Sequence, residues 1–378
     1  MYAHRSVLKL NPPRPRQTAF RRHLRVLLAA TVISLAATVV ALLSCASAYA
    51  AVDASALPPS TPTADGSAGV GFLAPAPVET DPLQGDTFFV DHDTQTAQAA
   101  AQYPALSVIA SQPGVERFGT FSGANVGLVA SNYLERAATQ EPGTVPMLST
   151  YRIVDGHCGH WADPPAAQLS YHNFIESLSQ GIGDFRAVMF LEMDSLITTG
   201  CLSPHGVTVR MDELNDAINI LTTNNPGVVI YLDAGAADAV PARPMARLLE
   251  RAGIAKVQGF FLNSTHFDWT THEIGYGEQI SALTGGKHFV VSTSVNGRGP
   301  LVPKRRVRSG NEVLCNPPNR GLGPKPTANT GYPNVDAFAW IGNPGYSGGQ
   351  CRPGAPPTGQ FWLPMALQLV QDADFAVQ

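Results

Sequence analysis

The chain has 378 residues, 44% of them hydrophobic and 14% charged, and a formal net charge of −4 at pH 7. This length allows one large α/β domain or two smaller ones. Seven of the 25 basic residues lie in the first 50 positions, so the remainder carries 18 basic and 29 acidic residues. Such a surface repels phosphate backbones, which argues against a nucleic acid partner.

Residues 1–50 have the pattern of an export signal. They hold seven Lys or Arg and no acid, followed by an apolar run over residues 26–43 and by Ala48, Tyr49 and Ala50, a small-x-small cleavage pattern. The alternative is an uncleaved anchor that tethers the protein to the membrane, because the apolar run is about long enough to span a bilayer. Cleavage near Ala50 is the favoured interpretation, and we expect a secreted or cell-surface protein.

Residues 51–84 are rich in Ala, Pro, Ser, Thr and Gly and predict a flexible linker. From residue 85 to residue 378, strand-like and helix-like segments alternate, which is typical of a parallel β/α barrel. The chain between residues 294 and 336 reads as an irregular loop, of a length that is usually functional. We expect strands at 145–153, 187–194, 228–233, 257–263, 288–294 and 337–341, and helices at 171–182, 209–223, 244–252, 272–283 and 363–372.

Three of the expected strands end an apolar run on polar side chains: Glu192 and Asp194, Asp233, and Asn263. The carboxyl ends of barrel strands share one rim, so these side chains should converge on one cleft. The apolar setting would raise the pKa of Asp194, as a general acid requires. The alternatives are that Asp194 caps the next helix and that Asn263 ties down a loop. The second carboxylate, Asp233, favours a catalytic site, with glycoside hydrolysis as the leading chemistry.

Four cysteines follow the leader: Cys158, Cys201, Cys315 and Cys351. An even number in an exported chain predicts two disulfides with three possible pairings, of which sequence order is the simplest. Two histidines flank Cys158, at His157 and His160, but their spacing fits no zinc pattern. We expect no metal site and no cofactor.

Eight short segments in the part of the chain after residue 85 resemble glycoside hydrolase family 6, the cellobiohydrolases and endoglucanases that cleave β-1,4-glucan with inversion. The segments are residues 190–196, 231–235, 274–277, 280–284, 315–318, 321–323, 329–331 and 335–338. The resemblance covers the chain from about Phe88 to its end. It implies a distorted, incomplete parallel β/α barrel with the glucan cleft across its top. The family pattern also fits the pairs Cys158–Cys201 and Cys315–Cys351.

The resemblance assigns roles to the strand-end residues. Asp194 occupies the proton-donor position, although Met193 replaces the proline that the family has before it. Asp233 matches the supporting aspartate, Asn263 a substrate contact, and Tyr151 the tyrosine that distorts the reactive sugar.

Other family positions are substituted. His157 replaces the aspartate that supports the acid and the water, so His157 is the candidate base. Tyr346 replaces a glutamate near the last strand and is a candidate substrate contact. An inverting enzyme needs a second group to activate water, and neither of the family's carboxylates for that role is present. The remaining substitutions are Gly342 for a lysine, Gly348 for an aspartate, Ala236 for a histidine, and Arg117, Ala239 and Leu314 for sugar-binding tryptophans.

These observations predict an exported, monomeric hydrolase that acts on β-1,4-glucan by an inverting acid/base mechanism with weak or altered activity. The alternative is an inactive carbohydrate-binding protein of the same fold. The resemblance favours the hydrolase, and the substituted base favours the binding protein. In either case the expected partner is a β-glucan polysaccharide or oligosaccharide.

Overall fold

The computed structural model describes residues 80–153, 164–301 and 315–378. The expected leader, most of the expected linker, His157 and Cys158 lie outside these ranges. The last linker residues belong to the folded unit, because Leu83 is fully buried and its backbone N–H donates to Asp81 at 2.8 Å. Leu83, in the predicted linker, is therefore packed against the fold.

Seven parallel strands form one curled sheet in which each strand pairs with the next in sequence, from β1 to β7. This arrangement confirms the predicted incomplete β/α barrel. The strands are short, four to six residues each, as parallel strands buried on both faces commonly are. Their bounds are β1 Val115–Gly119, β2 Met147–Tyr151, β3 Ala187–Leu191, β4 Val228–Asp233, β5 Gly259–Leu262, β6 His288–Ser292 and β7 Val335–Ala339.

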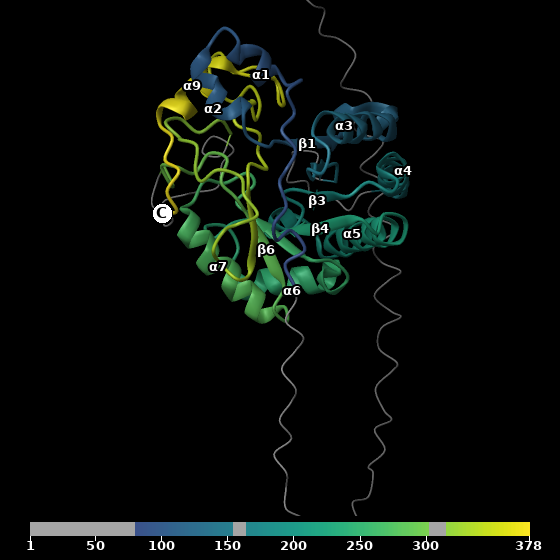
Figure 1. Cartoon of the computed structure of the whole chain (residues 1–378). Coiled ribbons are helices and arrows are strands. Elements are labelled where there is room, and N and C mark those ends of the chain that lie inside the picture. Colours follow the sequence, from purple (N-terminus) through teal and green to yellow (C-terminus); the bar gives the residue numbers. More distant parts are fainter. Residues whose placement is uncertain (1–79, 154–163, 302–314) are drawn as a thin grey trace, which may run out of the picture. The chain divides into compact units, whose positions relative to one another are not determined.

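Five helices follow successive strands and pack against one another in chain order. Figure 1 shows them in a row that runs from the right of the view (α3, α4 and α5) round to the bottom and lower left (α6 and α7), while α1, α2 and α9 group together at the upper left. The five are α3 Val126–Gln140, α4 Pro165–Ile182, α5 Pro204–Asn224, α6 Ala242–Ala252 and α7 Thr270–Leu283; the other three are α1 Gln95–Ala100, α2 Ser107–Ala110 and α9 Leu363–Gln371. Across the described ranges, no helix combines the length and apolar character that crossing a membrane requires.

Alternate residues of each strand enter two separate apolar cores. On β3, Met189 and Leu191 pack under the helices, while Val188 and Phe190 fill the barrel interior. Successive strand side chains point to opposite faces, so a continuous apolar run is what a strand covered on both faces needs. The same alternation on β4 turns Tyr231, and therefore Asp233 two residues later, toward the interior.

Several boundaries differ from the predictions for identifiable reasons. The strand predicted at 187–194 ends at Leu191, because Glu192 and Asp194 adopt positive φ angles of 53° and 64°. Helices α4 and α5 begin several residues early, each with a proline in its first turn, where proline is favoured. Strand β1 and helix α3 were not predicted. Glu116 and Arg117 interrupt the apolar pattern of β1, which hides it from a hydrophobicity argument.

Candidate active site

The two aspartates lie at the carboxyl ends of neighbouring strands. Asp233 is the last residue of β4, and Asp194 follows the end of β3 by three residues. Strands β3 and β4 pair in parallel with Leu191 opposite Leu232, so both carboxyl groups are delivered to the same rim of the barrel. The arrangement is the one predicted from the strand ends.

Asp194 sits in a tight, strained turn. Its φ of 64° is uncommon for a residue with a side chain, and such conformations cluster at functional sites. Hydrogen bonds to backbone carbonyls hold the turn. Ser195 N donates to Glu192 O at 3.1 Å, Thr198 Oγ1 donates to Asp194 O at 2.7 Å, and Arg210 Nη1 donates to Ser195 O at 2.9 Å. The carboxyl group of Asp194 is thereby fixed at the rim and does not act as a helix cap.

The environment of Asp194 suits a proton donor. Burial raises the pKa of its carboxyl group above the usual range, because a charged form is poorly solvated there. A hydrogen bond of 2.7 Å from Thr265 Oγ1, and the charges of His266 and Arg117, act in the opposite direction. On balance the pKa of Asp194 is raised, which is the direction that a general acid requires.

Asp233 supports the turn that carries Asp194. It is fully buried and accepts hydrogen bonds from the backbone N–H groups of Leu196 and Gly235, each at 3.2 Å. Burial, followed by the nearby charge of Asp194, raises the pKa of Asp233 to about 7. Two neighbouring buried carboxyl groups resist a second ionisation, so the pair holds a proton near neutral pH.

Glu192 accepts hydrogen bonds from the backbone and has a structural role. Its Oε2 accepts the N–H groups of Arg152 at 2.8 Å and Ile153 at 3.0 Å, and the side chain is fully buried. Burial raises the pKa of Glu192, and these two backbone bonds lower it. The contacts anchor the chain that leaves β2 after Tyr151.

Arg117 and Tyr151 lie on the interior side of neighbouring strands. Arg117 shares the face of Val115 on β1, and Tyr151, which ends β2, pairs in register with Gly119. Burial lowers the pKa of Arg117, while the charges of Asp194 and then Tyr151 raise it. Nη2 of Arg117 donates to Ile341 O at 3.3 Å. A guanidinium group whose charge acts on the carboxyl group of Asp194 therefore stands where the sequence comparison expects a tryptophan.

Both polar atoms of the Asn263 side-chain amide form hydrogen bonds with backbone groups. Nδ2 donates to Ser292 O at 3.0 Å and to Asp268 O at 3.3 Å, and Oδ1 accepts Asp268 N–H at 3.2 Å. Its backbone N–H donates to Gly235 O at 2.7 Å. These bonds support the alternative in which Asn263 ties down the loop after β5.

Tyr346 packs beside Phe361 and the start of α1. Its ring packs edge-on against Phe361 with centroids 5.7 Å apart, and its hydroxyl is within hydrogen-bonding reach of Thr96 and the backbone of Gln95. Burial raises the pKa of Tyr346, and those bonds lower it. The contacts give Tyr346 a packing role beside α1, and none of them brings it to Asp194.

The disulfides are described in part. Cys315 and Cys351 are bonded with S–S 2.00 Å, as predicted. Cys201 is also disulfide-bonded, and its expected partner Cys158 lies outside the described residues. His157, the candidate base, lies outside them too, so its role remains a sequence-based hypothesis.

Three residues that sequence reasoning did not single out complete the surroundings of Asp194. Thr265 donates to its carboxyl group, and His266 and Asp238 form a pair in which Nδ1 and Oδ1 are 2.8 Å apart. Thr265 and His266 lie two and three residues after Asn263, in the loop that follows β5. Asp238 lies five residues beyond Asp233 in a loop, and only the fold shows where it points.

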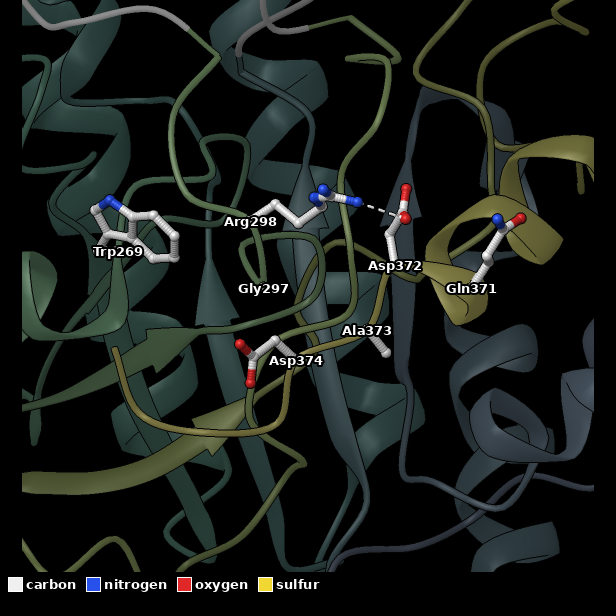
Figure 2. A pocket seen from close by; sticks show the side chains of 7 residues that line it. All are labelled: Trp269, Gly297, Arg298, Gln371, Asp372, Ala373 and Asp374. Atoms are coloured by element: carbon white, nitrogen blue, oxygen red, sulfur yellow. Dashed lines mark hydrogen bonds and ion pairs between the residues drawn. The ribbon is translucent and has the colours of Figure 1, made fainter.

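A separate pocket of about 410 Å³ lies beside the end of the chain (Figure 2). Trp269 lies on one side of it, and the Arg298–Asp372 ion pair lies nearby. Neither Asp194 nor Asp233 lines this pocket. We place the chemistry at Asp194, where these two carboxyl groups are neighbours. The lining residues are Trp269, Gly297, Arg298, Gln371, Asp372, Ala373 and Asp374.

The fold is an incomplete parallel β/α barrel with a carboxyl pair at its rim, and comparisons with known proteins identify its family. Residues 85–373 match the model of glycosyl hydrolases family 6, and the chain belongs to that family. It is 32% identical over 292 residues to endoglucanase A of Cellulomonas fimi, covering 76% of this chain and 61% of that protein. It is also 32% identical over 298 residues to endoglucanase 1 of Streptomyces halstedii. That match covers 75% of this chain and 88% of that protein.

A solved structure agrees with the sequence relatives. The endoglucanase Cel6 of Mycobacterium tuberculosis, in complex with methyl-cellobiosyl-4-deoxy-4-thio-β-D-cellobioside, superposes with a TM-score of 0.70 at 34% identity. The match covers 78% of this chain and 99% of that one. The Cellulomonas fimi relative extends well beyond the matched region, since the match spans less than two thirds of its length.

Proposed function

We propose that this protein is an exported hydrolase of β-1,4-glucan in which Asp194 is the general acid. The observation that carries the proposal is the partly buried carboxyl group of Asp194, bonded to Thr265 at 2.7 Å and held at the rim by a strained turn. Membership of a family with endoglucanase relatives supports the substrate class. Asp233 supports the acid by fixing the turn and by discouraging ionisation of Asp194.

From the family resemblance we infer an inverting mechanism with modified water activation. In such a mechanism the acid protonates the leaving oxygen while a second group removes a proton from water on the opposite face of the sugar. Glu192 and Asp233 are both held by backbone N–H groups, which leaves them poorly suited to that role. We propose His157 as the base, in the position of the family's aspartate, and Tyr151 as the residue that distorts the sugar.

A carbohydrate-binding protein without turnover is the second candidate. It is favoured by Arg117, which places a buried cation beside the acid where the family has a sugar-stacking aromatic ring. A loss of stacking surface and of the carboxylate base would leave recognition with little catalysis.

One experiment separates these functions. The purified protein is incubated with a soluble β-1,4-glucan and with cellohexaose, and released sugars and their anomeric form are followed by NMR. We expect α-anomers first, as inversion requires, and a loss of about 10²–10⁴-fold in Asp194→Asn. Asp184→Asn, a change at an exposed aspartate, is the matched control. Binding of cellohexaose without any release of sugar would decide for the binding protein.

The base is tested in the same assay. With His157 as base, the rate should rise with pH through a value near the ordinary histidine pKa of ~6.5. His157→Ala should abolish that rise. Turnover with the same pH dependence in both proteins would contradict a role for His157.

A further inference from the structure

His266 and Asp238 form an imidazole–carboxylate pair that sequence reasoning did not anticipate. Nδ1 of His266 lies 2.8 Å from Oδ1 of Asp238, and their side chains are only 9% and 17% exposed. This contact is an ion pair when the imidazole is protonated, so Asp238 favours the charged ring. Asp238 follows β4 and His266 follows β5, so two barrel loops meet in this contact.

The pair faces the candidate acid. Thr265, the residue before His266, donates its hydroxyl to Asp194 Oδ1 at 2.7 Å, which ties the loop after β5 to the turn after β3. Three carboxylates act on His266: Asp238 first, then Asp194 and Asp233. The charge of Arg117, on β1, also acts on Asp194.

Charge conservation shows why a cation is useful there. When Asp194 gives its proton to a leaving oxygen, a negative charge appears in a poorly solvated site beside a second carboxyl group, Asp233. A fixed positive charge nearby lowers the free energy of that carboxylate, and no solvent has to reorganise. A protonated imidazole can supply this charge, while Asp238 balances it in the resting protein.

We propose that Asp238 holds the imidazole of His266 where it stabilises the carboxylate that Asp194 becomes on donating its proton. His266 is then a positioning residue for the acid, and the Asp238–His266 pair replaces part of the charge balance that the missing family residues supplied. The catalytic benefit of this charge rests on the proposed hydrolytic function. The coupling between His266 and Asp194 is, however, a property of the resting protein.

The first test needs no turnover. Burial lowers the pKa of His266, but its contacts with Asp238 and then the charges of Asp194 and Asp233 outweigh this and leave that pKa raised. Because coupling between two sites is reciprocal, removing the charge of Asp194 must lower the pKa of His266. The imidazole resonances of His266 are titrated by NMR in the parent protein and in Asp194→Asn. We expect the midpoint to move to lower pH.

Two further variants keep this test decisive. Asp238→Asn should also lower the midpoint of His266, because the ring loses its nearest carboxylate. Asp216→Asn neutralises the partner of the surface histidine His172 and should leave the titration of His266 unchanged. A midpoint that does not move in either Asp194→Asn or Asp238→Asn, in proteins with native melting curves, overturns the inference.

The second test uses the hydrolysis rate. His266→Asn should lower kcat roughly 10–100-fold with little change in KM, since the stabilised charge forms only as the acid gives up its proton. Asp194 then ionises less readily, so the alkaline limb of the kcat/KM profile should move to higher pH. A rate loss with an unmoved alkaline limb would mean that His266 is merely structural. Absence of turnover in the parent would contradict the proposed function. It would not affect the NMR test of the coupling between His266 and Asp194.

Discussion

Asn343 and Val115 exchange two hydrogen bonds across the open side of the barrel. Asn343 Oδ1 accepts the N–H of Val115 at 3.0 Å, and Nδ2 donates to the carbonyl of Val115 at 2.8 Å. A side-chain amide thus does for β1 what a neighbouring strand would do, just after β7 ends. Arg117 adds a bond to Ile341 O, so the strand that carries it is fixed next to the candidate site.

Replacing this amide should loosen the barrel. Asn343→Asp removes the donor and sets a carboxylate oxygen against the carbonyl of Val115, leaving a buried acceptor unpaired. We expect the free energy of unfolding to fall by about 1–3 kcal/mol in urea titrations. The exposed Asn329→Asp is the matched control and should change little. Equal stability of the two variants would mean that the amide bridge contributes nothing.

Asp233 should matter for both stability and activity. Asn at this position can accept on one oxygen only, so the N–H of Leu196 or of Gly235 loses its partner and the turn that carries Asp194 loosens. Thermal unfolding should show a loss of about 1–3 kcal/mol, and glucan hydrolysis should fall with it. Full activity in Asp233→Asn would contradict the supporting role.

Asp81 should make the protein less stable as the solution becomes neutral. Burial, opposed by the N–H of Leu83 and reinforced by Asp336, raises the pKa of Asp81 from 3.8 to about 6. A raised pKa means that folding favours the protonated acid, so this contribution is full below about pH 4 and lost as pH rises through about 6.

The test is the pH dependence of Tm in Asp81→Asn. The amide keeps the acceptor for Leu83 N–H and adds a donor for Asp336. The variant should therefore match or exceed the parent at pH 7, and its advantage should shrink or reverse at pH 4. A constant difference between the two proteins across this range would rule out titration of Asp81.

The disulfide between Cys315 and Cys351 should stabilise the irregular segment before and after β7. It spans 36 residues of sequence, and Asn316 beside it donates to Gly349 O at 2.7 Å. Replacing both cysteines with serine should cost about 2–5 kcal/mol, by analogy with other native disulfides. Non-reducing peptide mapping of the parent should recover this pair together with Cys158–Cys201. A free thiol at Cys201 would contradict the second pair.

Local sequence patterns determined the repeating architecture. Apolar runs such as that of β3 are long enough to be covered on both faces, and the helices between them alternate regularly, which together require a parallel barrel. The same patterns placed Asp194 and Asp233 at one rim, because a strand's polar end is a property of the sequence itself. Strand β1 was missed because Glu116 and Arg117 break its apolar run, although pairing with β2 stabilises it.

The surroundings of the acid were decided by tertiary structure alone. The contacts of Asp194 with Thr265, and of His266 with Asp238, join loops after different strands, and no local pattern encodes which loop reaches which. Asn263 has the same sequence signal whether its amide faces sugar or backbone, and only the neighbouring carbonyls of Ser292 and Asp268 show that backbone occupies it. Periodicity reports burial along one segment, whereas hydrogen bonds and charges at a site depend on distances between segments far apart in the chain.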